Sequence, residues 1–559
     1  MSSETARSWV RHAAASTAFV VSLALLTVQA AGPRFFPDDP LATDDDAAFD
    51  ASGAAPRELS ETYDFVSNQF TEQGDRRSIP AVNVNTLDEV PDSSWFTNRI
   101  GRRPMTAAEI ARGPDTLDRL EIDEWIVTAG KGPAGFQPGF RAVNALDTRP
   151  IRERTLYQLE LDTENYPDLA TSGEIIGTAI YHAIGYNVVD TYLVNVDPRK
   201  VRIAPEATIR DASGVRPLIA KDIEEAFKAG ARNPDGTYRM TASRFVEGRP
   251  MGNFTHFGTR PDDPNDIYPH EHRRELRANR VFAAWINHDD SRALNTLDML
   301  VAAKGKSYIK HFMFDFGAIL GSSGDRRASG FEYMYEGKST LAGLLTLGLR
   351  VPSWEFAKYP NDLYPSVGLI EADLFDPEKW KPAYPNRAFG NMRPEDAFWG
   401  ARIVAQFTDE ALAGVVKKAQ FRDQRAADYV LSVLIKRRDK VVKTWLTGVN
   451  PLVNFRLAGD GTLTFDNAAV DAKASTPPSG YAIAWSRFDN ATDTHQPAGA
   501  EFTVSSPSAR APAELEGSQF VAVSVKTQHP DRTAWAEPVR AYFRREGGGW
   551  RTVGLERKP

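Results

Sequence analysis

Three stretches of the chain carry apolar residues at the spacing of an α-helix. Over residues 171–185 the apolar positions fall on one side of such a helix, and Gly185 stands where a glycine commonly ends one. These positions are Ile175, Ile176, Ala179, Ile180, Ala183 and Ile184. Further helices are expected over residues 271–286 and 424–446. The cations between Lys436 and Lys443 suit the C-terminal end of the last helix, where we expect a solvated basic face.

Beyond Gly448 the pattern changes to short runs of alternating apolar and polar residues. Turns are indicated at Gly459-Asp460-Gly461 and Gly547-Gly548-Gly549. The expected strands lie at 455–457, 463–465, 481–485, 502–504, 520–525 and 539–543, with a last one after the final glycine turn. Short strands with frequent turns predict a small all-β sandwich over residues 451–559.

The first 31 residues have the three-part layout of a secretory signal. Arg7 and Arg11 precede the apolar run 13–28, and Val28-Gln29-Ala30 offers a cleavage site of small residues. An uncleaved N-terminal membrane anchor is the alternative, because the run approaches the roughly 20 residues that span a bilayer. With either outcome we expect an exported protein, located in the periplasm or the cell envelope.

Two N-terminal regions separate this segment from the rest of the chain. Residues 32–58 carry six aspartates and no basic residue between Arg34 and Arg57, so we expect an acidic disordered linker, with a calcium site as the alternative. Residues 59–119 recover aromatic content. The run Pro91-Asp92-Ser93-Ser94-Trp95-Phe96 is interpreted as part of an ordered strap that packs on the following domain.

Composition removes several classes of protein from consideration. A chain of 559 residues with 42% hydrophobic residues is long enough for more than one packed domain. Because it contains no cysteine, it has no disulfide framework, thiolate metal site or cysteine nucleophile. The net charge of -7 gives no reason to expect nucleic acid as a partner.

A glycine-rich loop is the first of four segments that one chemistry would join. Gly130-Lys131-Gly132-Pro133-Ala134-Gly135 follows a strand-like run, and glycines allow backbone amides to approach phosphate oxygens. The second segment is Glu174 on the first helix, a carboxylate that could hold a phosphate-binding cation. Its alternative is purely structural, since Thr171 and Glu174 also have the spacing of an N-terminal capping box.

The third and fourth segments add carboxylates and an amide. His288-Asp289-Asp290-Ser291-Arg292-Ala293-Leu294-Asn295 places an aspartate five residues before an asparagine, with an arginine between them that can neutralise phosphate. An Asp/Asn-rich turn that ends a helix is the alternative. A hairpin over 297–302 and 307–314 then leads to Asp315-Phe316-Gly317 and brings Asp315 beside Asn295, which together could bind Mg²⁺.

In this order, the glycine loop, helix glutamate, H-x-D-x-x-x-x-N, hairpin and D-F-G resemble the protein-kinase fold. The chain looks more like its atypical HipA-type and CotH-type relatives. Residues 173–195, and the run from Arg273 to Arg292, also resemble a family of exported bacterial proteins. The resemblance implies an α+β fold with a two-lobed kinase-like domain over residues 120–450.

The same resemblance implies an ATP- and Mg²⁺-dependent phosphotransferase acting on a protein or small-molecule hydroxyl. Asp290 would be the catalytic base and Arg292 the phosphate contact. Asn295 and Asp315 would be the metal ligands. The nucleotide would lie on Gly130, Lys131, Gly132 and Gly135, with Glu174 as the partner of a lysine.

The strand lysine of the kinase pattern is missing from this chain. The run Thr155-Leu156-Tyr157-Gln158-Leu159-Glu160-Leu161-Asp162 has Gln158 or Glu160 where the pattern has Lys. Two interpretations follow. Lys131 replaces the strand lysine, as in the with-no-lysine kinases, or the protein is a pseudokinase, a catalytically inactive binding module of the cell envelope. The region 321–400 also has no A-P-E motif, so the resemblance implies nothing about how the substrate docks.

Overall fold

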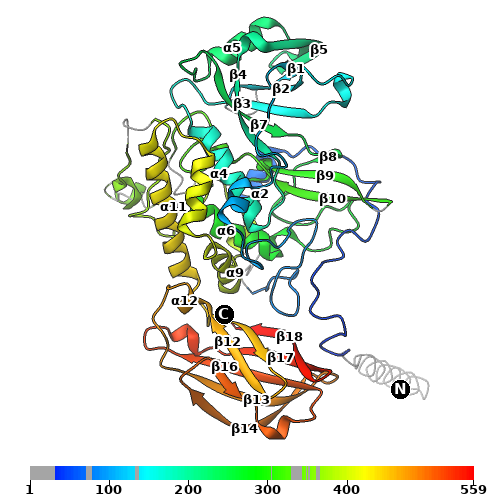
Figure 1. Cartoon of the computed structure of the whole chain (residues 1–559), viewed down its shortest axis with the longest axis vertical. Coiled ribbons are helices and arrows are strands. Elements are labelled where there is room, and N and C mark those ends of the chain that lie inside the picture. The colour runs from blue at the N-terminus through cyan, green and yellow to red at the C-terminus, as the bar shows by residue number, and fades with distance from the viewer. Residues whose placement is uncertain are drawn as a thin grey trace, which may run out of the picture.

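The computed structural model describes residues 32–70, 78–132, 137–303, 305–328, 341, 343–347, 349, 353–360 and 365–558. Helices account for 27% of the structure and strands for 28%, which confirms the α+β class. Figure 1 shows three parts along the long axis: a part built on a sheet, a mainly helical part in the middle, and a part made of strands. The expected signal or anchor over residues 1–31 lies outside the described residues. Within the described ranges, no helix combines the length and apolar character needed to cross a bilayer.

The first part is a seven-stranded sheet in the order β4-β7-β3-β2-β1-β5-β6. Its strands are β1 (Trp125–Gly130), β2 (Gly139–Asn144), β3 (Leu156–Leu161), β4 (Thr191–Val196), β5 (Val201–Asp211), β6 (Gly214–Pro217) and β7 (Tyr238–Arg244). Only β1 and β5 pair in parallel; the other neighbours are antiparallel. Helix α5 (Ala220–Lys228) packs Phe227 on one face, against Phe140 and Tyr238. Because successive strand residues alternate between faces, Glu160 lies on the opposite face from its buried neighbours Leu159 and Leu161.

Helix α4 (Leu169–Ile184) confirms the helix expected over 171–185, and nearly all of its residues are buried. The alternative interpretation of Thr171 and Glu174 as a capping box is wrong, because the helix has Asp168 and not Thr171 as its N-cap residue. Asp162, at the end of the sheet, accepts hydrogen bonds from the backbone N–H groups of Asp168, Ala170 and Thr171, each at 2.9 Å. A carboxylate from outside the helix therefore satisfies donors that the first turn leaves without helical partners. Glu174 is thus free for another role.

The middle part packs helices around the largest apolar core. Its helices are α6 (Arg274–Ile286), α8 (Arg387–Gly390), α9 (Pro394–Val404), α10 (Asp409–Lys418) and α11 (Gln424–Trp445), with α2 (Glu61–Phe70) and α3 (Ala107–Arg112) contributed by the N-terminal region. A three-stranded sheet, β8 (Arg249–Gly252), β9 (Thr296–Ala303) and β10 (Lys306–Met313), lies beside them. The helices expected at 271–286 and 424–446 are confirmed.

The basic residues of α11 do not all face solvent, which corrects the expectation. Arg437 is fully buried, and its guanidinium donates to the carbonyls of Ala284 and Trp285 at the end of α6. It also lies over the ring of Phe375, 3.5 Å from the ring centre. The last carbonyls of a helix lack helical partners, so this arginine joins α11 to the end of α6, just before the loop that carries Asp290.

The C-terminal part consists of two sheets around one apolar core. The first contains β11 (Leu452–Leu457), β12 (Thr462–Asn467) and β15 (Ser508–Arg510). The second contains β13 (Gly480–Asp489), β14 (Thr494–Val504), β16 (Phe520–Gln528), β17 (Val539–Glu546) and β18 (Gly549–Arg557). The short helix α12 (Ala468–Asp471) follows β12. All the expected strands fall within these elements, whereas β15 was not expected.

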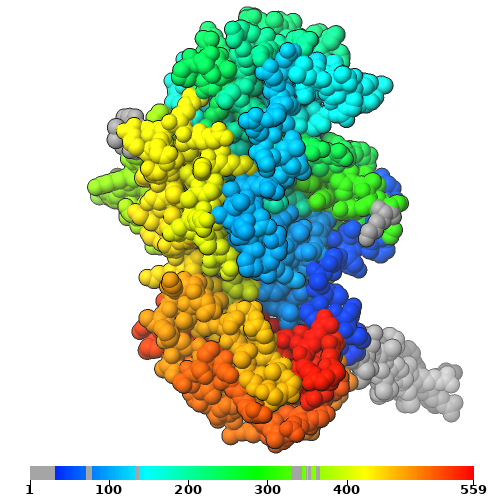
Figure 2. All heavy atoms as spheres, in the orientation of Figure 1, coloured from blue at the N-terminus to red at the C-terminus, as the bar shows by residue number. Residues whose placement is uncertain are grey.

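Residues 32–58 do not form a disordered linker. Phe35 is buried between Phe488 and Tyr542 of the C-terminal part, and the carboxylate of Asp46 accepts hydrogen bonds from the backbone and hydroxyl of Ser94. Acidic composition alone predicts a disordered linker, and this prediction is wrong because aspartates such as Asp46 accept hydrogen bonds from the rest of the protein. The N-terminal segment up to about residue 120 runs along the face shown in Figure 2, beside each of the three parts. In the strap, Trp95 is buried, as expected.

Candidate functional site

The segment from His288 to Asn295 forms a loop between α6 and β9, and side chains from a later segment hold it in place. Asn287 ends α6 in the left-handed conformation, with φ of 54°, and accepts a hydrogen bond from the indole of Trp380 at 2.9 Å. Asn386 donates to the carbonyl of Ser291 at 3.1 Å. Residues 380–386 therefore fix the backbone that presents Asp290.

Asp290, Arg292 and Asn295 meet within this loop. Nε of Arg292 lies 2.7 Å from Oδ1 of Asp290, and Nδ2 of Asn295 donates to Oδ2 of Asp290 at 3.0 Å and to its carbonyl at 2.8 Å. Burial raises the pKa of Asp290, although the charge of Arg292 opposes the shift. The loop thus brings together three of the residues singled out in the sequence.

The β9–β10 hairpin brings Asp315 to the same place. Thr296 pairs with Met313 at the open end of the hairpin, and the N–H of Phe314 donates to the carbonyl of Asn295 at 3.3 Å. Asp315 follows with φ of 63°, in the left-handed region. The expected hairpin is confirmed, and Asp315 directly follows the backbone contact between Phe314 and Asn295.

Phe316 connects this segment with α4. Its buried ring lies 4.7 Å from the ring of Tyr181 and 5.5 Å from that of His288. A Cβ atom on Gly177 would lie only 2.4 Å from Cβ of Phe316, so only a glycine fits there. The close approach holds the D-F-G segment against the helix that carries Glu174.

Glu174 lies buried beside this segment without an ion-pair partner among the described side chains. Its carboxylate accepts a hydrogen bond from the backbone of Phe316, which lowers its pKa, but burial and the charges of Asp315 and Glu160 outweigh this bond and raise the pKa to about 8. We expected Glu174 to be the partner of a lysine. The structure instead pairs Lys131 with Glu160, with Nζ 2.7 Å from Oε1.

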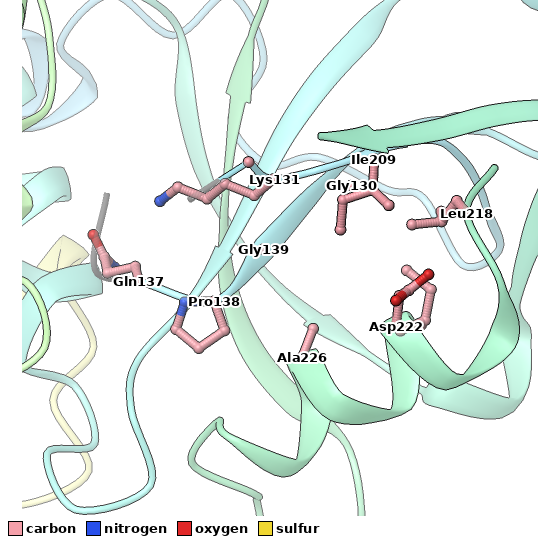
Figure 3. A pocket seen from close by; sticks show the side chains of 11 residues that line it. Gly130, Lys131, Gln137, Pro138, Gly139, Ile209, Leu218, Asp222 and Ala226 are labelled. Carbon is pink, nitrogen blue, oxygen red and sulfur yellow. The ribbon is translucent and has the colours of Figure 1, made fainter. Parts of the chain in front are cut away.

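The side chain of Lys131 reaches Glu160, one of the two β3 residues that stand where the kinase pattern has a lysine. Gly130 ends β1, and Lys131 and Gly132 follow it, whereas Gly135 lies outside the described residues. A cavity of about 270 Å³ lies between this loop and α5. In Figure 3 the side chain of Lys131 points toward Gln137 and away from Leu218 and Asp222, which line the opposite wall of the cavity.

The charged groups of the site form one electrostatic cluster. Burial and the charge of Glu160 raise the pKa of Asp315 to about 6, while Lys131 and Arg292 oppose the shift and Asp290 adds to it. Four carboxylates, Glu160, Glu174, Asp290 and Asp315, thus share two cations, Lys131 and Arg292. Such an excess of negative charge favours protonation of the carboxylates or binding of a further cation.

Asn295 and Asp315 are the residues expected to bind Mg²⁺. Asn295 directs its amide nitrogen to Asp290, which leaves its oxygen, together with the carboxylate of Asp315, as oxygen ligands. Oxygen donors of these two kinds are among those that Mg²⁺ takes from proteins, with phosphate and water as its other ligands. In the described part of the chain, no group of three or more histidine, aspartate or glutamate side chains is arranged to hold a metal ion by itself.

Two residues at the site carried no signal in the sequence. Glu61, on α2, forms an ion pair with Arg292, and the ring of Tyr384 lies under the guanidinium of Arg292, 4.7 Å away. Both come from regions expected to be structural, the strap and the segment after the D-F-G, and neither lies in a motif.

A search of protein-family models, curated proteins and solved structures finds no match to this chain.

Proposed function

We propose that the chain is an exported, two-lobed kinase-like phosphotransferase. The phosphoryl group would pass from ATP or another nucleotide to a hydroxyl of a protein or small molecule. The seven-stranded sheet with α4 would be one lobe, and the helices with β8–β10 the other. The observation that carries the proposal is the convergence of Asp290, Arg292 and Asn295 on one loop with Asp315 beside Asn295.

In this mechanism the acceptor oxygen attacks the γ-phosphorus and its proton passes to Asp290. The bond from the γ-phosphorus to the bridging oxygen breaks, and the nucleoside diphosphate leaves with that oxygen. Burial raises the pKa of Asp290 and makes it a better proton acceptor than an exposed aspartate. Mg²⁺ held by Asn295 and Asp315 would neutralise phosphate charge.

Lys131 would supply the cation that kinases carry on the strand. It already reaches the carboxylate of Glu160, whose strand ends near Asp162, the residue that caps α4. When a nucleotide binds, its phosphates would compete with Glu160 for this ammonium group. Lys131 is thus the residue on which nucleotide affinity depends in this proposal.

A pseudokinase that binds a ligand without transferring phosphate is the second candidate. Two observations favour it. Glu160 brings a negative charge to the place of the strand lysine. Glu61 forms an ion pair with Arg292, the residue proposed to contact phosphate. The two candidates share a binding site and differ only in turnover.

The test is a thermal shift of the full chain with ATP and Mg²⁺, compared with ATP alone. Ligand at a hundred times its dissociation constant stabilises a protein by about 2.7 kcal/mol, which is a measurable shift. We expect a metal-dependent shift that Asp315→Ala abolishes, and, with water as the acceptor, a metal-dependent hydrolysis of ATP to ADP and phosphate that Asp290→Asn abolishes. A shift without turnover supports the pseudokinase, and no shift contradicts both candidates.

A further inference from the structure

Helix α2 is docked with its polar side inward. Asp64, Ser67 and Asn68 are buried, with 6–8% of their surface exposed, whereas Tyr63 and Phe70 are 65% and 71% exposed. Residues 63, 66 and 70 form a stripe along one side of a helix, and Val66 is also exposed. Amphipathic helices normally bury the apolar side, so little apolar area drives the docking of α2.

Polar contacts hold α2 against the segment that supports the catalytic loop. Arg387 donates from its backbone to Oδ1 of Asn68 at 3.3 Å and from its guanidinium to the carbonyl of Ser67 at 2.6 Å. The ring of Phe65 meets that of Tyr384 edge-on, with 6.2 Å between ring centres. Arg387 directly follows Asn386, which holds the carbonyl of Ser291 in the loop.

The first residue of α2 reaches the proposed phosphate contact itself. Glu61 forms an ion pair with Arg292, whose other neighbours are the carboxylate of Asp290 and the ring of Tyr384. A phosphate oxygen has the same charge as this carboxylate and takes the same guanidinium N–H donors. Phosphate therefore cannot gain the full contact with Arg292 until Glu61 withdraws.

We propose that α2 is a removable cover of the catalytic loop, in which Glu61 holds Arg292 in place of the transferred phosphate. This inference rests on the proposed function, because it takes Arg292 as the phosphate contact. The side chain of Glu61 is 58% exposed, and exposed ion pairs contribute at most about 1 kcal/mol. The cover is thus held weakly enough for phosphate to displace Glu61.

The absence of cysteine from the chain permits a direct test. A single thiol at the buried position of Ser67, made by S67C, reacts with a maleimide only when α2 leaves its site. We expect E61Q to raise the rate of reaction by up to about five-fold, the equivalent of one exposed ion pair. Inorganic phosphate should raise the rate with Glu61 present and add little in the E61Q chain.

The matched control is S518C, in the loop before β16 of the C-terminal part, at a position that is 7% exposed and remote from α2. Its rate should respond neither to E61Q nor to phosphate. An unchanged S67C rate in the E61Q chain, or no effect of phosphate, overturns the proposal. Hydrogen exchange of peptides from residues 61–70 in the cysteine-free chain, with and without E61Q, gives the same comparison if S67C does not fold.

These readouts need no turnover, so they separate the cover from the proposed function. A pseudokinase with a removable cover shows the labelling response and no phosphate transfer. A phosphotransferase whose α2 stays in place shows transfer without the labelling response, which contradicts only the cover. Where both hold, E61Q also raises the rate of transfer.

Discussion

Lys131 and Glu160 form an ion pair of 2.7 Å between the loop after β1 and strand β3. The pair sets the charge of the candidate site, because Glu160 also raises the pKa of both Glu174 and Asp315. A cation from the loop thus partly offsets a carboxylate that would otherwise add to the repulsion between two buried acids. The two partners therefore do not contribute equally to stability.

Replacing Lys131 with methionine should destabilise the protein more than replacing Glu160 with glutamine. K131M leaves Glu160 and Asp315 without this cation, and we expect the free energy of unfolding to fall by about 1–2 kcal/mol. E160Q breaks the same pair but removes one of the repelling charges, so its loss should be smaller. Urea unfolding at neutral pH measures both values.

The control for this comparison is the exposed pair of Lys200 and Asp123. K200M should leave the free energy of unfolding nearly unchanged, because solvent screens this pair. Equal losses for K131M and E160Q would contradict the view that repulsion among the carboxylates matters. Equal losses would mean that the ion pair between Lys131 and Glu160 accounts for the whole change in the free energy of unfolding.

Glu174 should make stability fall as the pH rises from acid to mildly alkaline values. Its pKa is raised from 4.5 to about 8 in the folded protein, so folding favours the protonated form. The stabilisation is fully present below pH 4.5 and is lost as the pH rises through 8. E174Q removes this dependence while its amide oxygen still accepts the hydrogen bond from Phe316. The stability of E174Q relative to the native chain should therefore increase from pH 5 to pH 9.

Urea unfolding of both chains across this range checks the expectation. Asp315 titrates in both chains, and because its charge acts on Glu174, the difference between the chains reports Glu174 together with its coupling to Asp315. A constant difference from pH 5 to pH 9 would show that Glu174 is ionised throughout. The pH at which the difference stops growing reports the pKa in the folded state.

Local patterns in the sequence predict much of the fold and of the candidate site. The helix at 171–185, the hairpin before Asp315 and the C-terminal strands follow from periodicity and turn residues, which depend on near neighbours. Asp290, Arg292 and Asn295 meet because they lie within one loop. The loop position of Lys131 makes it a candidate to replace the strand lysine, but its contact with Glu160 depends on how the strands pair in the sheet.

The parts that the sequence did not predict depend on contacts between distant segments. Asp162 caps α4 from the end of β3, and the capping pattern at Thr171 suggested a different arrangement. Glu61 lies 231 positions from Arg292 and is in no motif. Residues 32–58 gain order only through partners such as Ser94, which an acidic composition does not reveal. Resemblance to a family supplies none of these contacts.

Gly177 should be intolerant of alanine although it lies in the middle of a helix. A Cβ atom there would lie 2.4 Å from Cβ of Phe316, inside the packed interface between α4 and the D-F-G segment. We expect G177A to lower the free energy of unfolding by about 1–3 kcal/mol, as in other overpacked cores. Thermal or urea unfolding measures the loss.

Gly414 in α10 is the matched control, because a Cβ atom there meets its nearest neighbour at 3.5 Å, an ordinary contact. G414A should be neutral or stabilise the protein by up to about 1 kcal/mol through helix propensity. If both variants behaved alike, the approach of Phe316 to α4 would not limit the residue at position 177.

Asp64 should make the docking of α2 tighter in acid than at neutral pH. Burial raises its pKa to about 6 from the ordinary 3.8, although the charges of Arg387 and Arg292 lower it in part. The docked helix therefore favours the protonated carboxyl, and this stabilisation is lost as the pH rises from about 4 to above 6. The protection of α2 amides against hydrogen exchange, corrected for the intrinsic rate at each pH, should fall over this range. D64N should lose this fall in protection, because the amide has no proton to lose. D428N, on the exposed side of α11, should retain the native dependence. A pH dependence that persists in D64N would assign it to another group on α2 or on the loop beneath it.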